Sequence, residues 1–185
     1  MKQFRKTLLI ILFFTSTLFM YSCDEDKKGV NDPLLGFYTI SKSILTAPCA
    51  SQNGAATLPS GTNVTAEILN AFLSDIVCAS SGDKAIEIAE NGKIYFVCRV
   101  EGKKQDQGSW AINQDRTELT LTLLIQGSPI PLKLTGFTES GAKVGGNVAS
   151  LPVPPALLAS VENAFAGVDD EFILIAIDIE LEKFN

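Results

Sequence analysis

Alternation of apolar and polar side chains with a period of two is the dominant pattern along most of this chain. Ile86 and Ile88 alternate with polar neighbours, and the dipeptide Asn91-Gly92 is followed by the apolar run 94–97. An Asn-Gly dipeptide between two such segments is typical of the tight turn of a β-hairpin. The sequence therefore predicts two antiparallel strands joined by this dipeptide.

Other segments have the composition of short strands connected by turns. In the last of them, residues 171–182, Ile177, Ile179 and Leu181 alternate with acidic residues, which is the pattern of a strand with one solvated face. Such a terminal strand needs partners on its edges, and pairing with the first strand would close the sheet. The other strand segments are 34–41, 108–112, 119–123 and 130–134, with a further hairpin edge within 136–146. The total of about eight strands predicts a mainly β fold, an antiparallel barrel that is filled by side chains or holds one small ligand.

Helical periodicity replaces this alternation at two places. After Thr62 and Asn63, either of which can cap a helix, apolar residues recur every three or four positions. A second helix is predicted to begin at Pro154 and Pro155 and to end near Gly167. The apolar sides are Val64, Ile68, Leu69, Phe72 and Ile76 in the first helix, and Leu157, Leu158, Val161 and Phe165 in the second. Two amphipathic helices are thus inserted before the second and the last strand of the barrel.

The beginning of the chain has the organisation of an export signal. Lys2, Arg5 and Lys6 precede an apolar run at 8–20, which is shorter than the roughly 20 residues that span a bilayer as a helix. This order predicts a cleaved signal peptide and not a permanent transmembrane anchor.

A cysteine ends the apolar run where an Ala-x-Ala cleavage site would be usual. Ser22 directly precedes Cys23, which resembles the lipobox of bacterial lipoproteins. The resemblance implies cleavage before Cys23, a diacylglyceryl group on its thiol and anchoring in a membrane by lipid. A secreted protein with an ordinary Cys23 is the alternative. Residues 1–22 are then the signal peptide, 23–33 a flexible acidic tether and 34–185 the folded domain.

Three acidic residues, Asp24, Glu25 and Asp26, follow this cysteine. They resemble the export tag of lipoproteins of the Bacteroidetes group, which implies a lipid-anchored protein of the outer membrane that is exposed on the cell surface. A solvated acidic leader is the alternative. In other Gram-negative groups, an aspartate after the lipid-bearing cysteine favours retention in the inner membrane.

Charge and composition narrow the function classes. Loss of the three cations of the signal peptide takes the formal net charge from −6 to −9, and no basic cluster remains to neutralise a phosphate backbone. Nucleic acid is therefore not an expected partner. The chain has no histidine, which removes Ser-His-Asp and Cys-His catalysis and His-ligated metal sites. The carboxylates of residues 169–171, Asp115 and Glu118 lie at predicted turns, so we expect neither an enzyme nor a bound cofactor.

The cysteines indicate one disulfide bond. With Cys23 assigned to lipid, Cys49, Cys78 and Cys98 remain in an oxidising compartment, where one pair and one leftover thiol are expected. We predict the pair Cys78 and Cys98, which closes a loop of about 20 residues between the end of the first helix and the end of a strand. A zinc site made of the three cysteines is the rival, but their spacing lacks a Cys-x₂-Cys element.

Several short motifs occur in the order found in one group of barrels. They are Leu35-Gly36-Phe37-Tyr38, Cys78, Asn91-Gly92, Cys98 and Gly108-Ser109-Trp110. Over about residues 34–124 they resemble the lipocalin-like lipoprotein domains common in the Bacteroidetes group, with Tyr38 in place of that group's first tryptophan. The resemblance implies an eight-stranded lipocalin-like barrel, to which the two helices are additions.

Two functions of different class follow from the expected barrel. The first is binding of a small apolar ligand, with Phe72 and Phe165 as a lid or wall of the cavity and Trp110 in its lining, although packing in the core is the alternative for each ring. The second is an interaction module without a cavity, an accessory of an envelope or nutrient-capture complex. Its contact surface would be the segments 47–62 and 139–155, which are rich in Gly, Pro and Ser and are predicted to be loops.

Overall fold

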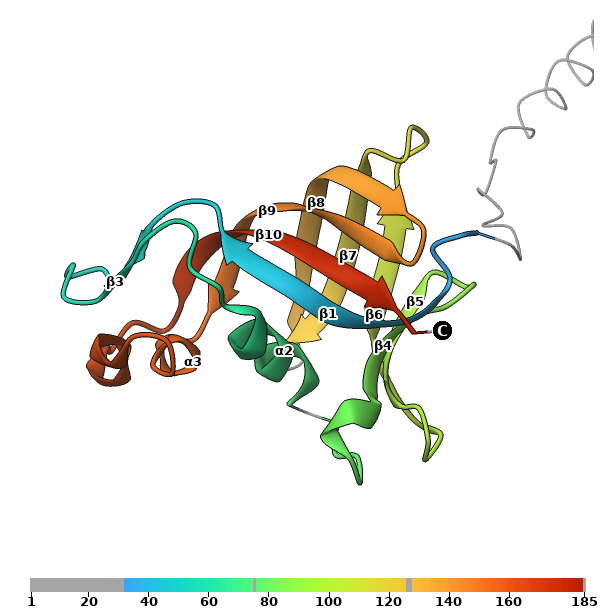
Figure 1. Ribbon diagram of the computed structural model, residues 1–185, viewed down its shortest axis with the longest axis horizontal. Coiled ribbons are helices and arrows are strands. Elements are labelled where there is room, and N and C mark those ends of the chain that lie inside the picture. Colours follow the sequence, from blue (N-terminus) through green and yellow to red (C-terminus); the bar gives the residue numbers. More distant parts are fainter. Residues whose placement is uncertain (1–31, 75, 126–127, 185) are drawn as a thin grey trace, which may run out of the picture.

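The computed structural model describes residues 32–74, 76–125 and 128–184 (Figure 1). The predicted signal peptide at 1–22, the lipid-bearing Cys23 and the acidic triplet after it lie outside the described residues. Within the described part of the chain, no helix is long and apolar enough to cross a membrane.

Eight strands form a closed antiparallel barrel, which confirms the predicted fold class. They are β1 (Gly36–Leu45), β4 (Lys84–Ile88), β5 (Lys93–Cys98), β6 (Lys103–Ile112), β7 (Glu118–Ile125), β8 (Ser128–Ser140), β9 (Lys143–Val153) and β10 (Ile173–Lys183). Their order around the barrel is β1, β10, β9, β8, β7, β6, β5 and β4. The strand predicted at 108–112 begins earlier than expected, because residues 103–107 also belong to β6. Closure pairs the edges that an open sheet would leave free.

The first and the last strand close the barrel as expected. Ile40 of β1 lies opposite Leu181 of β10, and the other edge of β1 pairs with β4. On β10, Ile177 and Leu181 are buried in the barrel, whereas Asp178 and Glu182 are exposed. The alternation in the sequence therefore separates the inner from the outer face of this strand.

Two Gly-x-aromatic units lie at the end of the barrel where β1 begins. Gly36 and Gly108 have φ angles of +147° and +134°, and a Cβ at Gly108 would lie 1.9 Å from the carbonyl oxygen of Thr122, so only glycine fits there. Two residues further on, Tyr38 and Trp110 are buried, and each donates a side-chain hydrogen bond of 2.8 Å to a backbone carbonyl. Tyr38 thus has the same role in β1 that Trp110 has in β6.

The first predicted helix is α2 (Thr65–Leu73), which lies at the opposite end of the barrel (Figure 1). The residue at the cap position is Val64, not the predicted Thr62 or Asn63, and it makes no side-chain cap hydrogen bond. The Asn63 side chain still accepts a hydrogen bond of 3.0 Å from the Thr65 amide, the first of the helix. Ile68 and Phe72 on the predicted apolar side are buried. After α2, a short 3₁₀ helix, η1 (Ser81–Asp83), leads into β4.

The prediction of one continuous second helix is wrong. The chain forms a single turn, α3 (Pro155–Leu158), and a separate 3₁₀ helix, η2 (Asn163–Gly167). Between them Glu162 has an extended backbone with φ −138° and ψ 110°, and its carboxylate caps the first turn of η2. The apolar residues Leu158 and Phe165 are buried in spite of the break. The helical spacing therefore indicated burial correctly but not continuity.

The two segments expected to be loops differ from each other. Residues 47–62 contain a short hairpin, β2 (Cys49–Ala50) and β3 (Thr57–Leu58), beside the start of β10. The prediction of a loop at 139–155 is wrong, because β9 occupies most of it and pairs with both β8 and β10. The physical reason is burial, since the side chains of one face of this strand are buried in the barrel: Val144, Val148, Leu151 and Val153. Their burial outweighs the low strand propensity of the Gly and Pro residues in the segment.

The predicted disulfide bond joins Cys78 and Cys98, and Cys49 is a buried free cysteine. The bond connects the segment that follows α2 to the end of β5. It therefore attaches the helical insertion covalently to the barrel wall.

We expect replacement of both Cys78 and Cys98 by alanine to lower the free energy of unfolding by about 3 kcal/mol, because the bond constrains the unfolded chain. Chemical denaturation of a chain that starts at Asp24, and so holds every barrel strand, measures the loss. After denaturation without reductant, Cys49 alone should react with iodoacetamide. Labelling of all three cysteines under these conditions would contradict the pairing.

Candidate functional site

The cavity inside the barrel is lined, among the residues that the structure describes, by aliphatic and phenylalanine side chains. They are Ile40, Phe72, Ile86, Ile88, Ile94, Phe96, Leu121, Leu123, Leu132, Leu134, Val148, Leu151, Ile177, Ile179 and Leu181. The cavity left between them has a volume of about 30 Å³, which is the share of one water molecule in the liquid. With the side chains in these positions, the interior is therefore nearly filled.

The helix α2 covers one end of the barrel, here called the helical end, and is held at both of its own ends. At its start the Ser43 amide of β1 donates a hydrogen bond of 2.8 Å to the Thr65 hydroxyl. At its end the Lys84 ammonium, at the start of β4, donates one of 2.8 Å to the Leu73 carbonyl. These contacts fix the backbone of α2 across the opening, with the ring of Phe72 against the interior cavity.

A second hollow, the α2–α3 groove, shares Phe72 and Leu151 with the lining of the interior cavity and has a volume of about 330 Å³. It is lined by Ile68, Asn70, Ala71, Phe72, Ser74, Ile130, Leu151, Pro152, Val153, Pro154, Ala156, Leu157 and Phe172. None of these described lining residues is charged. The Ser160 hydroxyl donates a hydrogen bond of 2.7 Å to the Glu67 carboxylate, which links the two helical segments that form the walls.

Exposed apolar side chains gather at the helical end. Val77, Val100, Leu124 and Leu174 are 76%, 79%, 40% and 65% exposed. They belong, in order, to the segment after α2, the β5–β6 turn, the end of β7 and the start of β10, all of which lie at this end. These four residues, here called the apolar rim, are distributed around the opening and add exposed apolar area at the helical end.

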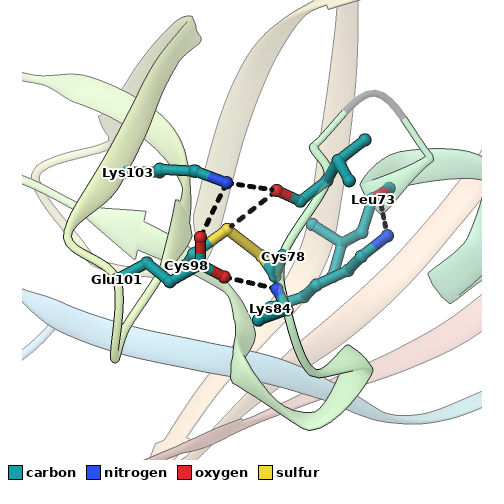
Figure 2. Close-up of a disulfide and its surroundings, with 8 residues drawn as sticks. Leu73, Cys78, Lys84, Cys98, Glu101 and Lys103 are labelled. Atoms are coloured by element: carbon teal, nitrogen blue, oxygen red, sulfur yellow. Dashed lines mark hydrogen bonds and ion pairs between the residues drawn. A yellow bond between two sulfur atoms is a disulfide. The ribbon is translucent and has the colours of Figure 1, made fainter.

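Figure 2 shows the disulfide bond at the helical end with charged groups beside it. The Lys103 ammonium forms an ion pair of 2.6 Å with Glu101 and donates a hydrogen bond of 3.2 Å to the Val77 carbonyl. In the part of the chain that the structure describes, Cys78, Cys98 and Glu101 are the cluster with the spacing of metal ligands. Zinc binds thiolates, and Cys78 and Cys98 supply none while they are joined in a disulfide bond. The structure therefore does not support the three-cysteine zinc site.

An ion-pair network holds the start of the described chain at the other end of the barrel, here called the tether end. Arg116, in the β6–β7 turn, donates hydrogen bonds of 3.0 and 3.1 Å to Asp32 and one of 2.8 Å to Glu139. The hydrogen bonds that the Arg116 guanidinium donates to Glu139 and Asp32 raise its pKa above its ordinary range. The Lys183 ammonium adds a hydrogen bond of 3.2 Å to the Pro33 carbonyl. The chain therefore enters the barrel at a fixed point.

Tyr38 lies beside this network, and its hydroxyl donates a hydrogen bond of 2.8 Å to the Leu34 carbonyl. Burial of the side chain, and then the negative charges of Glu139 and Asp32, raise the pKa of Tyr38 to about 12. The phenol therefore stays neutral over the whole physiological range.

We expect the stability of the fold to fall as the pH rises from about 10 to about 12, because the unfolded chain ionises Tyr38 near its ordinary pKa of 10 whereas the folded chain holds the proton to about 12. The contribution of this raised pKa is fully present below pH 10. Urea unfolding at pH 8 and pH 11 measures the loss. Tyr38→Phe removes the titrating group, so a loss of equal size in this variant would contradict the assignment.

The three aromatic residues predicted to line a ligand cavity are not brought together. Phe72 lines both the interior cavity and the α2–α3 groove. Trp110 is buried at the tether end, Phe165 is buried in η2, and neither belongs to the described lining of these two hollows. Trp110 and Phe165 pack in the hydrophobic core. A ligand-binding role for Phe72 stays a prediction.

The groove residues that sequence reasoning missed include Ala71, Ala156 and Phe172. Alanine carries no sequence signal for a binding site, because its role here is to leave space between α2 and α3. Of the acidic residues at turns, Asp170 accepts a hydrogen bond of 2.8 Å from the Gln52 amide, and Glu118 pairs with Lys133 at 2.9 Å. These two carboxylates therefore make contacts that stabilise the fold.

Comparison of the chain with models of known protein families, with curated proteins and with solved structures found no match. The function is therefore inferred from the geometry of the barrel and from the motifs of the sequence.

Proposed function

We propose that the protein is a lipid-anchored lipoprotein of the cell envelope whose barrel binds a small apolar ligand at the helical end. The observation that carries the proposal is that an interior cavity with apolar lining and a groove of about 330 Å³ share the side chains of Phe72 and Leu151. Pockets for small ligands have volumes of about 300–1,000 Å³ and mostly apolar walls. The groove reaches this range, and the apolar rim around the helical end adds surface on which an apolar molecule is attracted.

The placement of the chain's entry point supports the anchoring part of the proposal. Asp32 is held at the tether end, whereas the α2–α3 groove lies at the helical end. The segment from Cys23 to Asp32 reaches at most about 30 Å when fully extended. Lipid on Cys23 would hold the tether end near the membrane and leave the groove facing away from it. Asp24, Glu25 and Asp26 favour the outer membrane and the cell surface as its location.

We expect Cys23→Ala to move the protein from the membrane fraction to the soluble fraction, because two acyl chains supply the anchoring energy at about 0.8 kcal/mol for each buried CH₂. Fractionation of cells fed an alkyne-labelled fatty acid measures both the location and the label. Cys49→Ala is the matched control, since this cysteine is buried in the fold and should leave both unchanged. Cys23→Ala protein that stays labelled in the membrane would contradict the anchor, and protein left uncut when protease is added to intact cells would contradict surface exposure.

We expect native mass spectrometry of a chain starting at Asp24, exported in its own host and purified without detergent, to detect a bound mass that is lost on denaturation. The physical reason is that an apolar ligand in the groove removes hydrocarbon surface from water on both molecules. A clean mass of the protein alone, in preparations that retain the disulfide bond, would contradict the ligand-binding function.

The second candidate is a surface interaction module, and two observations favour it. The interior cavity of about 30 Å³ is nearly filled, and the apolar rim, with Val77 and Val100 more than three-quarters exposed, has the character of a protein contact surface. The contact surface would then be this rim together with residues 47–62, since most of the segment 139–155 belongs to strand β9 of the barrel. A pull-down from the host that recovers one reproducible partner, and loses it with Val77→Ser and Val100→Ser, distinguishes this function from ligand binding.

A further inference from the structure

The ladder between β8 and β9 stops before the helical end, so the barrel wall is split there. Pairing continues as far as Leu134 and Val148, and none of the described residues 129–133 pairs with 149–153. Each strand stays paired on its other side, β8 with β7 and β9 with β10. The α2–α3 groove lies at this split, since Ile130 of β8 and the last residues of β9 both line it.

Prolines on both strands explain the split. Pro129 and Pro131 lie opposite residues of β7, and Pro152 lies opposite Leu174 of β10. A proline has no N–H to donate, so within a paired strand it fits where its nitrogen faces away from the partner. The three nitrogens therefore face the split, where a ladder between β8 and β9 would need donors. A bulge of β9 directly after Val148 marks the same place.

The strand edges at the split offer hydrogen-bond acceptors and few donors. In an antiparallel strand, the carbonyl of a residue points to the same side as its nitrogen. The Pro152 carbonyl therefore faces the split, and Pro152 belongs to the lining of the groove. An added peptide strand would bring carbonyls of its own to edges that cannot donate to them, which disfavours β-strand addition. A small molecule that donates a hydrogen bond is the better match.

Volume and charge restrict this molecule further. The groove, at about 330 Å³, lies near the lower limit of the roughly 300–1,000 Å³ that is usual for small-molecule pockets. The interior cavity of about 30 Å³ is too small to hold an additional part of the ligand. No charged residue is among the described lining of the groove, so an ionised group would lose its hydration there without an ion partner. The site therefore fits a compact and uncharged molecule.

We propose that the ligand is a compact, uncharged aromatic or alicyclic molecule with a hydroxyl or N–H group, which lies wholly in the α2–α3 groove and donates a hydrogen bond to the Pro152 carbonyl at the split between β8 and β9. This inference rests on the proposed ligand-binding function and adds the position and the chemical class of the ligand. The apolar body of the ligand contacts Phe72, Leu151 and Phe172.

The position is tested with N-phenyl-1-naphthylamine, a neutral dye that has one N–H group and fluoresces in apolar surroundings, and with the chain that starts at Asp24. Ala156→Trp places an indole in the groove, at an exposed residue of its lining. Ala166→Trp is the matched control, because Ala166 is an exposed alanine of η2 outside the described lining. Thermal unfolding checks each variant, and Ala156→Leu replaces Ala156→Trp if the indole disturbs the fold.

We expect Ala156→Trp to weaken dye binding about tenfold, because the indole occupies much of a small groove, and Ala166→Trp to leave it unchanged. Equal affinity of these two variants would overturn the groove as the binding position and leave the ligand-binding function intact. Failure of the unsubstituted chain to bind the dye would overturn the proposed function together with the inference.

The chemical class is tested by competition against the dye near neutral pH. The compounds are 1-naphthol, which is uncharged and donates one hydrogen bond, 1-methoxynaphthalene, which cannot donate, and the anion 1-naphthoate. We expect 1-naphthol to displace the dye at a concentration about fivefold lower than 1-methoxynaphthalene, the effect of one net hydrogen bond. Displacement by 1-naphthoate should need about tenfold more than by 1-naphthol, since the carboxylate loses its hydration. Equal or better displacement by 1-methoxynaphthalene would overturn the hydrogen bond, and by 1-naphthoate the uncharged class.

Discussion

The pairing of β1 with β10 is the constraint on which the rest of the structure depends. These strands are the first and the last of the barrel, and their register, with Ile40 opposite Leu181, closes the sheet. Closure turns the apolar face of every strand inward, so the interior becomes a lined cavity and not an exposed surface. The Ser41 hydroxyl adds a hydrogen bond of 2.9 Å to Glu180 across the seam. The same strand β1 then supplies Ser43, which fixes the start of α2.

Closure also gives the barrel two ends with different chemistry. At the tether end, Arg116 binds Asp32 and Glu139, and the buried rings of Tyr38 and Trp110 fill the space between strands. At the helical end, α2 covers the opening with α3 beside it, and the disulfide bond attaches the segment after α2 to the wall (Figures 1 and 2). One end is therefore suited to holding the chain in place and the other to binding.

The sequence predicted the fold well because the signals for a barrel are local. Alternation along residues 177–182, the Asn91-Gly92 turn and the helical spacing of Ile68 and Phe72 each depend on a few neighbouring residues. Prediction failed where distant contacts decide. Residues 139–155 are rich in Gly and Pro, yet they form β9, because β8 and β10 offer an edge on each side.

The sequence by itself determined the closed β-barrel, the disulfide pair and the burial of Phe72, Trp110 and Phe165, because period and residue type indicate which side chains leave water. It does not indicate what a buried side chain packs against. Only the tertiary structure decided that Trp110 and Phe165 lie in the core whereas Phe72 lines two hollows, since the α2–α3 groove is formed by helices about 80 residues apart in the chain. The contact between these helices depends on the closure of the whole barrel.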